Sequence, residues 1–430
     1  MNKNCAFTIC ATNYIGLAKI LQKSIHEYYS GVDFYIVVAD EPSVEVRKTF
    51  DDNIIIAKEC IGFPEDKWYE MAFKYNLTEF CTSIKPKSIT YLFSLGYEKC
   101  IYFDPDILCF KSIEPIYEDY LAAHSAVVTP HYIEMEETFS CIGLPESDTL
   151  RDGVFNLGFI GVKKCPKIEQ FLIWWSKRLE DCCYCALNEP YFTDQKWVDR
   201  LPCYLGDELY ISLNKGMNLA PWNYHERVIA IKEGRFVVYN RIVKDENPDD
   251  LMFVHFSGYN YKQLLHGEMA RRDRNEKNNY EDTKLILDAY LEKLLEGDFG
   301  EYIDNKYTYN YLRNDEHVPN RNARRIYRAY IRKYGYDGNP FEVTTSFTQK
   351  AIAKELMQKD GGYKEVRIHQ VSEAVGKKTI WINRILKCLY KIIGPNKYFY
   401  FIKAFRKYGA DENHYFLVKD EDYSFFEKEL

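Results

Sequence analysis

Short apolar runs alternate with longer segments of helical periodicity through the first 265 residues of this 430-residue chain. Apolar runs that end in a polar turn are typical of strands buried on both faces of a sheet. Segments with apolar residues every three or four positions are typical of helices packed on such a sheet. Strands are predicted at 5–10, 33–39, 54–57, 99–103, 125–129, 152–162 and 252–258, and helices at 17–29, 67–95 and 167–179. The alternation predicts an α/β fold.

The composition changes at about residue 265 to a charged, tyrosine-rich helical pattern. We therefore expect a sheet-containing domain over 1–265 and a mainly helical region over 266–430. Within the second region, residues 376–410 hold nine Lys or Arg residues and no Asp or Glu, interleaved with aliphatic and aromatic residues. In an acidic chain this reversal favours a surface for anionic lipid head groups or a charged polymer. The alternative is a basic helix that pairs with the acidic first domain.

The composition also narrows the class of protein and its compartment. A net charge of −7 argues against a general nucleic-acid binder. The apolar stretch at 5–11 is too short for a secretory signal, and no apolar run is long enough to span a bilayer. The 13 cysteines, scattered through apolar stretches, are typical of reduced thiols in a cytoplasmic protein. The cluster at 182–185 includes a Cys-x-x-Cys, but it lacks a second pair, which favours a packed helix end over zinc.

The predicted strand at 99–103 ends in the acidic turn Asp104-Pro105-Asp106. Ligands of open α/β sheets bind at the carboxyl ends of the strands. Two carboxylates at such a place are costly to bury without a cation, and Mg²⁺ or Mn²⁺ bridging them to a phosphate would remove that cost. Pro105 fixes φ at the turn, which aims both carboxylates from a rigid corner. The turn is therefore a candidate metal site, with an ordinary solvated turn as the alternative.

Two common phosphate-binding patterns are absent from the sequence. No Gly-x-Gly-x-x-Gly follows the first predicted strand, and no Gly-Lys-Ser/Thr loop occurs. A nucleotide site in this chain would therefore depend on a metal ion and on side chains. Lys85 or Lys87 could reach a diphosphate, or either could be a solvated lysine. His255, delivered to a glycine turn by the last predicted strand, could complete a metal shell or be an ordinary buried group.

Several polar side chains lie in apolar surroundings. Asn156 lies in a glycine-bearing strand pattern, where its amide needs backbone partners or a bound sugar. Thr193 could cap a helix that begins at Asp194. The segment 218–227 concentrates hydrogen-bonding side chains around one tryptophan, a density typical of a sugar or phosphate surface. The polar loop at 131–148 is long enough to be a substrate-covering flap.

These motifs resemble, in their order, those of the GT-A glycosyltransferases. They are nearest to the retaining family of bacterial lipooligosaccharide galactosyltransferases and glycogenin, and to related capsule and O-antigen enzymes. The matching segments are Cys10-Ala11-Thr12-Asn13-Tyr14, Tyr102-Phe103-Asp104-Pro105-Asp106, Phe155-Asn156-Leu157-Gly158, Asp194-Gln195 and His255-Phe256-Ser257-Gly258. The resemblance implies a GT-A (Rossmann-like) nucleotide-sugar-binding mixed sheet flanked by helices, with the mainly helical C-terminal region outside it.

The resemblance also implies a function and its residues. The implied function is metal-dependent transfer of a hexosyl group from a nucleotide diphosphate sugar, by default a UDP-sugar, to a hydroxyl of a glycan or lipid-linked acceptor in bacterial surface polysaccharide synthesis, with retention. The implied ligands of Mn²⁺ or Mg²⁺ are Asp104, Asp106 and His255. The implied donor-binding residues are Thr12, Asn13, Tyr14, Lys85, Asp104, Asn156, Gly258 and Lys262. The implied residues of the reaction centre are Asp194 and Gln195, with Asp194 or Asp152 as the general base if the reaction inverts.

The sequence departs from the family pattern near the phosphate contacts. Lys262 lies one residue later than the family's phosphate lysine, and the usual Lys-Pro-Trp ending is missing. Two other functions stay open: a sugar-1-phosphate nucleotidyltransferase, whose usual glycine-rich signature is absent here, and a non-catalytic carbohydrate-binding relative. We expect a cytoplasmic protein without nucleic-acid partners that contacts the inner face of the membrane through 376–410.

Overall fold

The computed structural model describes residues 3–135, 146–185, 189–243, 247–264, 266, 280–297, 299–359 and 368–418, and their side chains except those of 368–380 and Lys407. The chain forms two compact units. The first comprises Met1–Phe63 and Leu77–Thr308, and the second comprises Pro64–Asn76 and Tyr309–Leu430. The segment Pro64–Asn76 therefore belongs with the C-terminal region rather than with its neighbours in sequence.

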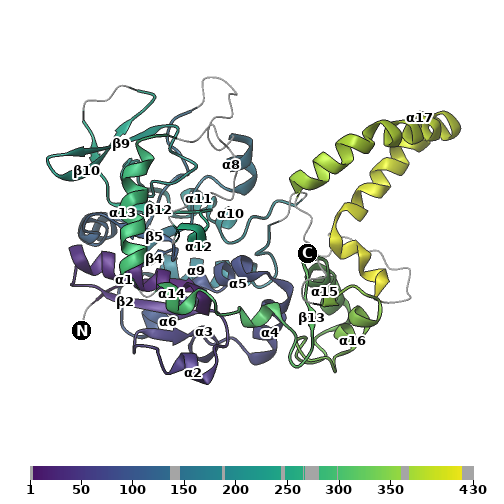
Figure 1. Cartoon of the computed structure of the whole chain (residues 1–430), viewed down its shortest axis with the longest axis horizontal. Coiled ribbons are helices and arrows are strands. Elements are labelled where there is room, and N and C mark those ends of the chain that lie inside the picture. The colour runs from purple at the N-terminus through teal and green to yellow at the C-terminus, as the bar shows by residue number, and fades with distance from the viewer. Residues whose placement is uncertain are drawn as a thin grey trace. The chain divides into compact units, whose positions relative to one another are not determined.

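The central sheet of the first unit, in which Figure 1 labels β2 and β4, has seven strands in the order β3-β2-β1-β4-β7-β6-β8. Strand β1 pairs in parallel with β2 and β4, β2 with β3, and β6 with β8, whereas β7 runs antiparallel to both β4 and β6. The strands are β1 Asn4–Cys10, β2 Asp33–Val38, β3 Ile54–Ile56, β4 Lys99–Phe103, β6 Ala126–Val128, β7 Phe159–Lys163 and β8 Leu209–Ile211. The predicted α/β fold, with a mixed sheet flanked by helices, is confirmed.

Helix α1 (Ile15–Tyr28) has apolar residues on two faces. One face lies in the same core cluster as β1, β2 and β4, and the other joins a second cluster with α13 (Thr283–Glu296). Helices α6 (Lys85–Ser94) and α9 (Pro166–Leu179) pack against each other. The other described α-helices of this unit are α2 Val44–Arg47, α3 Ala57–Cys60, α5 Leu77–Ser83, α7 Leu121–Ala123, α8 Glu146–Asp152, α10 Gln195–Val198, α11 Leu201–Leu205, α12 Tyr261–Leu264 and α14 Phe299–Tyr302.

A short antiparallel strand pair begins directly after the acidic turn. Strand β5 (Ile107–Cys109) pairs with β12 (Phe253–His255), and His255 lies opposite Ile107. A bridge between Leu219 and Val254 fastens a third segment beside β12. A separate three-stranded sheet consists of β9 Arg227–Lys232, β10 Arg235–Asn240 and β11 Asp249–Asp250. Segments far apart in the sequence therefore meet at the end of β4.

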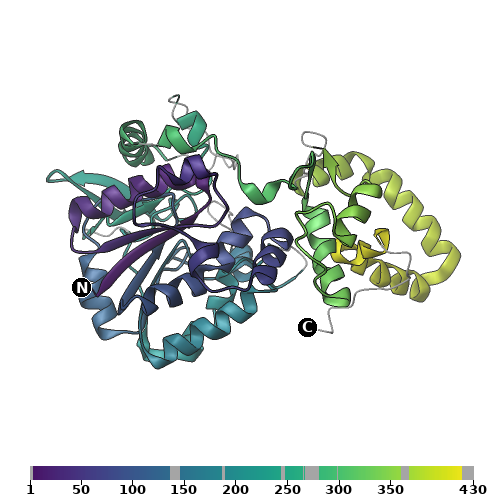
Figure 2. The ribbon, with the colours of Figure 1, turned by 90° about the horizontal axis from the view of Figure 1, so that it is seen from below.

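The second unit is mainly helical (Figure 2). Arg324 is buried and donates to the backbone carbonyl oxygens of Ala72, Phe73 and Tyr75, so a guanidinium satisfies the end of α4. The elements of this unit are α4 Glu65–Lys74, α15 Arg321–Tyr334, α16 Ser346–Ala353, α17 Ile368–Arg406, and β13 His317–Val318 paired with β14 Gln358–Lys359. By their contacts, α13 and α14 belong to the first unit, past residue 265. The division into 1–265 and 266–430 stays a prediction about the extent of the catalytic domain.

The local structure differs from the predicted elements in two places. The predicted helix at 67–95 is interrupted because Tyr75 is extended, with φ −102° and ψ 146°, and ends α4. The predicted strand at 152–162 begins only at Phe159, because α8 ends at Asp152 and Gly153 turns the chain with a φ of 116°. Of the expected flap at 131–148, residues 136–145 lie outside the described residues.

Candidate functional site

Two carboxylates and one imidazole meet at the end of β4. The pairing of β5 with β12 brings His255 beside the acidic turn, although about 150 residues separate them in the sequence. The His255 Nε2 atom lies 3.5 Å from Asp104 Oδ2 and 3.1 Å from Asp106 Oδ1. The three possible ligand atoms all lie within 4.8 Å of one another. The structure thus brings together the three residues predicted to hold a metal ion.

Two tyrosines orient the carboxylates of this triad. The Tyr102 hydroxyl donates to Asp104 Oδ1 at 2.5 Å, and the Tyr261 hydroxyl lies 3.0 Å from Asp106 Oδ2 and 2.5 Å from the Phe256 carbonyl oxygen. Each tyrosine therefore occupies one carboxylate oxygen and leaves the other facing His255. Two carboxylate oxygens and one imidazole nitrogen are a donor set that suits Mn²⁺ and also accepts Mg²⁺. The residues present fit a divalent ion.

The charges of the triad depend on one another. Removal from water raises the pKa of the Asp104 carboxyl, although His255 and Lys85 lie close to it. Removal from water would also raise the pKa of Asp106, but the imidazole of His255 and the hydroxyl of Tyr261 hold it below its ordinary value. Burial alone would lower the pKa of His255, and its contact with Asp106 instead raises it. The carboxylates thus draw positive charge to the place where a cation would bind.

Gly158 allows His255 to approach the sheet. A Cβ atom on Gly158 would lie 2.4 Å from His255 Cε1 and 2.5 Å from Nδ1, closer than real Cβ contacts come. The Asn156 Oδ1 atom accepts from Gly158 N at 3.0 Å and from Asn218 Nδ2 at 3.2 Å. The glycine of the Phe-Asn-Leu-Gly segment is therefore required by the imidazole beside it. The amide oxygen of Asn156 thus accepts only from groups of the chain itself. Its amide nitrogen lies 3.4 Å from His131 Nε2.

A buried ion pair adjoins the triad. The Lys85 Nζ atom donates to Asp194 Oδ2 at 2.5 Å and to the Leu157 carbonyl oxygen at 2.8 Å, and both charged side chains are at most 2% exposed. Lys85 also lies 4.0 Å from the centre of the Tyr102 ring. Lys87 instead lies over the ring of Phe63. The structure therefore places Lys85, and not Lys87, beside the acidic turn.

The residues next to Asp194 hold the irregular segment in place. The Gln195 side chain accepts from Leu157 N at 3.2 Å and donates to the Asp152 carbonyl oxygen at 2.9 Å. The Asp152 carboxylate itself pairs with Arg151. Helix α10 begins at Gln195, and no side chain caps its start, so the expected cap by Thr193 is wrong. Thr193 has a φ of 47° and its hydroxyl faces the Asp194 carboxylate instead.

The turn after β1 lies close to the same edge of the sheet. Thr12 donates from its backbone N and its Oγ1 to Asp40 Oδ1, at 3.2 and 2.7 Å. Burial raises the pKa of Asp40 to about 6 despite these two hydrogen bonds. The ring of Tyr14 lies edge-on to Tyr261, with ring centres 5.8 Å apart. Thus a tyrosine links the predicted nucleotide turn, which also holds Asn13, to the triad.

Lys262, predicted to hold the donor phosphates, lies beside Asp304 on the surface. Its Nζ atom is exposed and bonded to Asp304 Oδ1 at 2.5 Å. Tyr261, one residue earlier, reaches Asp106 instead. Gly258 has a φ of 80°, which favours glycine at the turn after β12. A phenol, not an ammonium, therefore lies nearest to the acidic turn in the stretch after β12.

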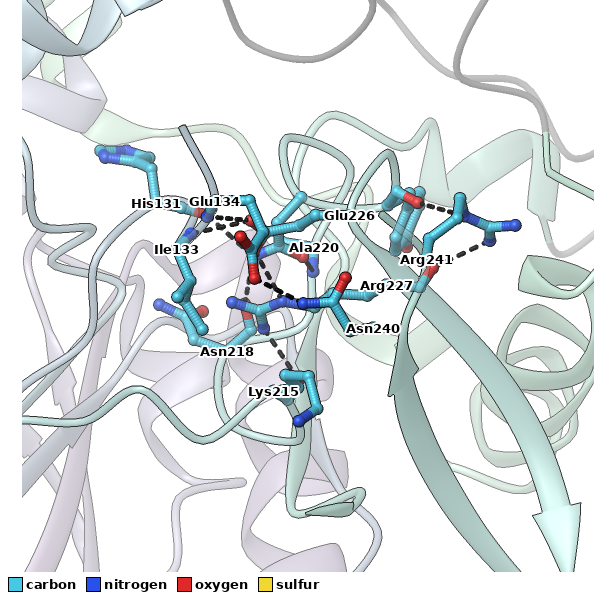
Figure 3. Close-up of polar contacts among 12 residues, drawn as sticks. His131, Ile133, Glu134, Lys215, Asn218, Ala220, Glu226, Arg227, Asn240 and Arg241 are labelled. Carbon is cyan, nitrogen blue, oxygen red and sulfur yellow. Dashed lines mark hydrogen bonds and ion pairs between the residues drawn. The ribbon is translucent and has the colours of Figure 1, made fainter. Parts of the chain in front are cut away.

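The polar segment 218–227 joins parts of the chain by hydrogen bonds rather than forming a ligand-binding surface (Figure 3). Glu226 accepts from the backbone N of Ile133 and Glu134 and pairs with Arg227, and both charged side chains are 2% exposed. Asn223 donates to the His131 carbonyl oxygen. The predicted sugar or phosphate surface is therefore wrong for these buried side chains, which bond to the chain itself. They fasten residues 131–135 to the segment that leads into β9.

Trp222 is the member of this segment that faces the triad. Its ring lies edge-on to His255, with ring centres 5.0 Å apart, and edge-on to His131 at 5.5 Å. Burial lowers the pKa of His131 to about 4, so this imidazole is neutral at pH 7. No separate sequence signal marked Tyr102, Tyr261 or Asp40. Tyr102 precedes the acidic turn, Asp40 follows the second predicted strand and Tyr261 follows the last one, and only these positions could have indicated them.

The cysteine cluster at 182–185 packs against Glu79 of α5. Cys182 and Cys183 are buried, and the Cys183 thiol lies beside the Glu79 carbonyl oxygen. Within the described ranges, the triad is the one group of three or more His, Cys, Asp or Glu side chains close enough to share an ion. The interpretation as a packed helix end agrees with this.

Comparison with known proteins gives distant relatives. No protein-family model matches the chain. The uncharacterised protein YfnF of Bacillus subtilis strain 168 is 24% identical over 261 residues, which cover 59% of this chain and 80% of that protein.

Three solved structures similar to this chain are glycosyltransferases. The galactosyltransferase LgtC, in complex with donor and acceptor sugar analogues, is 15% identical with a TM-score of 0.39, over 68% of this chain and 96% of that one. The bifunctional glycosyltransferase WbbM is 13% identical with a TM-score of 0.39, over 70% and 51%. GlyE of Streptococcus pneumoniae is 14% identical with a TM-score of 0.35, over 73% and 67%. Glycosyltransferases are the class that the sequence motifs resemble.

Proposed function

We propose that this chain is a metal-dependent glycosyltransferase that moves a hexosyl group from a nucleotide diphosphate sugar, by default a UDP-sugar, to a hydroxyl acceptor. The observation that carries the proposal is the triad of Asp104, Asp106 and His255 at the carboxyl end of a central strand, with possible ligand atoms within 4.8 Å of one another. The edge of an open α/β sheet is where such folds bind nucleotides. The resemblance of five ordered motifs to GT-A enzymes supports the same function.

The chemical difficulty of this reaction is the departure of a diphosphate whose negative charge grows as the glycosidic bond breaks. A divalent ion held by Asp104, Asp106 and His255 would supply Lewis-acid stabilisation of that charge. Tyr102 and Tyr261 keep the carboxylates oriented before any ligand arrives, so little reorganisation is needed on binding. The protein thus contributes a preformed set of oxygen and nitrogen donors.

The Lys85–Asp194 pair supports the reaction centre. Lys85 holds the Asp194 carboxylate beside the segment 156–158, and it retains a third N–H for a diphosphate oxygen. We assign Asp194 and Gln195 to orientation of the donor sugar, together with Asn156. Retention of configuration is part of the proposal because the resembled family retains. An NMR assignment of the product linkage as opposite to that of the donor would overturn retention.

If the reaction inverts, Asp194 or Asp152 is the candidate general base. Each already has a cationic partner, Lys85 for Asp194 and Arg151 for Asp152. A base role would therefore require that pair to open or to share its carboxylate. This arrangement favours retention as the first hypothesis.

The remaining contacts of the donor are assigned as follows. The turn Thr12-Asn13-Tyr14 would hold the base and ribose, with Asp40 fixing the turn from behind. Gly258 would let the backbone approach the diphosphate. Lys262 would have to exchange Asp304 for a phosphate, which is a modest change because both side chains are exposed. The acceptor would be a glycan or a lipid-linked molecule of bacterial surface polysaccharide synthesis, met in the cytoplasm at the inner face of the membrane.

The proposal is tested by the melting temperature of the purified protein with UDP, GDP, CMP or dTDP, each with and without Mn²⁺. Selective binding stabilises the folded state by about 2.7 kcal/mol at a hundredfold excess over the dissociation constant. We expect a shift that requires Mn²⁺ and favours one nucleotide, and its loss in Asp104→Asn and Asp106→Asn. Asp288→Asn, an exposed change of the same type on α13, is the matched control. A protein that no nucleotide stabilises would contradict the proposal and favour a non-catalytic relative.

A further inference from the structure

Helix α17 forms two arms joined by a sharp turn. The turn lies at Gly394, which has a φ of 78° and precedes Pro395, so the helix cannot continue through it. Figures 1 and 2 show the two arms folded back from this turn. None of the described side chains from 381 to 406 is buried. We call residues 381–406 the hairpin.

The hairpin exposes large apolar side chains. Trp381 is 67% exposed, Ile385 65% and Ile392 80%, all on the first arm. On the second arm, Tyr400 is 78% and Phe405 55% exposed. Several large apolar side chains exposed on one element mark a candidate interaction site, because folded proteins bury most such side chains. The hairpin therefore needs a partner outside the described contacts of its own unit.

The first arm separates its apolar and basic side chains onto different faces. At 3.6 residues per turn, the apolar residues fall within an arc of about 140°, and the basic residues fall on the opposite side. The apolar residues are Trp381, Ile382, Ile385, Leu386, Leu389, Ile392 and Ile393, and the basic residues are Arg384, Lys387 and Lys391. This is the pattern of a helix that lies in a membrane interface, with its apolar face in the acyl boundary and its cations at the phosphates.

We propose that the hairpin docks on an anionic phospholipid surface. Charge complementarity selects this partner, since residues 376–410 hold nine Lys or Arg and no Asp or Glu. A second copy of the hairpin would bring like charges together without a compensating acid. No helix among the described residues is long and apolar enough to cross a membrane. The separate apolar and basic faces of the first arm favour docking in the plane of the interface. This docking depends on no step of the proposed sugar transfer.

The test is sedimentation of the full-length protein with vesicles of phosphatidylcholine alone or with 30% phosphatidylglycerol (about a third anionic lipid, enough for a negative surface potential). We expect binding to the anionic vesicles, weakened by high salt. The variant Arg384→Gln/Lys387→Gln/Lys391→Gln should bind the anionic vesicles about 100-fold more weakly, at roughly fivefold per charge. The variant Trp381→Ser/Ile385→Ser/Ile392→Ser should lose binding even at low salt.

The matched control is Lys48→Gln/Lys232→Gln/Lys284→Gln, which removes the same charge from exposed positions of the first unit. Equal binding by this control and the hairpin charge variant would overturn the proposal. So would a dimer in sedimentation equilibrium that the apolar variant dissociates, because the occupant would then be a second copy. Depth-dependent quenching of tryptophan fluorescence by brominated lipids, lost in Trp381→Phe, gives an independent readout. Nucleotide-dependent melting is unaffected in every case, which separates this proposal from the proposed function.

Discussion

In a folded protein most charged side chains are exposed and most large apolar side chains are buried. The candidate metal site and the hairpin depart from this rule in opposite ways. At the site, charged groups are drawn away from water: Lys85 and Asp194 are at most 2% exposed, and His255 is 4% exposed. On the hairpin, apolar groups such as Ile392 are left in water. Buried charge and exposed apolar surface both raise the free energy of the folded chain unless a partner compensates them. Each region therefore indicates a ligand of opposite character, a cation with a diphosphate in one case and a lipid surface in the other.

The Glu226–Arg227 pair shows that buried charge alone does not indicate a ligand site. It is as deeply buried as Lys85 and Asp194, yet Glu226 accepts from two backbone amides and Arg227 donates to two backbone carbonyls (Figure 3). The hydrogen bonds of this pair are therefore made to groups of the protein itself. At the triad, by contrast, two carboxylates converge on one imidazole. Convergence of like charges, rather than burial alone, distinguishes a ligand site from a structural pair.

The largest expected effect is on the converging carboxylates. Asp104→Asn and Asp106→Asn each keep the shape of the side chain and remove a charge, so we expect sugar transfer to fall at least about 1,000-fold with little loss of stability. Glu226→Gln, at the structural pair, should instead lower stability and leave Mn²⁺ affinity unchanged. Transfer rates and Mn²⁺ titrations check both. Loss of Mn²⁺ binding in Glu226→Gln would contradict the distinction between the triad and the structural pair Glu226–Arg227.

A second effect concerns the buried ion pair beside the triad. Lys85→Met should destabilise the protein by about 3–5 kcal/mol in urea unfolding, because it leaves the Asp194 carboxylate buried and unpaired. The double variant Lys85→Met/Asp194→Leu should recover most of this loss while remaining inactive. Lys87→Met is the control, since Lys87 is only partly buried. A single Lys85→Met variant as stable as the control would contradict the pairing.

A third effect is a dependence of stability on pH. Burial raises the pKa of Asp40 from 3.8 to about 6, which corresponds to about 3 kcal/mol between the protonation states. Below about pH 4 the carboxyl is protonated in both the folded and the unfolded chain, so the pKa difference costs nothing there. Between about pH 4 and 6 the unfolded chain loses its proton first, and the stability of the folded chain falls as pH rises.

Asp40→Asn should remove this fall while its amide oxygen still accepts from Thr12. Urea unfolding of both proteins between pH 4 and 7 measures the difference, which should grow to about 3 kcal/mol in favour of the asparagine variant. Asp288→Asn, on the exposed side of α13, should give no such difference. A constant difference between the wild-type protein and Asp40→Asn across this range would show that the carboxyl titrates normally.

The smallest expected effect is on the approach of His255. Gly158→Ala would place a Cβ atom 2.4 Å from His255 Cε1, so the imidazole must shift away from the carboxylates. We expect Mn²⁺ affinity to fall about 10–100-fold, the usual cost of disturbing the orientation of a metal ligand. Gly300→Ala, where nothing lies within 4 Å of the added atom, is the control. Unchanged Mn²⁺ affinity in Gly158→Ala would mean that His255 binds no ion.

The candidate metal ligands could be proposed before the fold was known. An acidic turn directly after an apolar run predicts carboxylates at the end of a strand, because strand and turn are local features. The place of His255 after the last predicted strand already made it a candidate third ligand, although no spacing argument could have paired it with Asp104. Lys85 and Lys87 could not be separated by sequence, because either can face the sheet edge until the direction of α6 is fixed.

The alternation of strands and helices, the acidic turn and the basic, apolar-rich character of the hairpin can be seen in the sequence, since each depends on residues near one another in the chain. Which side chains share a site depends on the folded structure. Asn223, Glu226 and Arg227 are buried and bond to the chain itself, although the density of polar side chains in this segment had predicted a ligand-binding surface. The fold places Tyr261 beside Asp106 and Lys262 beside Asp304. Hydrogen-bond partners come from segments remote in sequence, and only the folded chain fixes which of them a polar side chain meets.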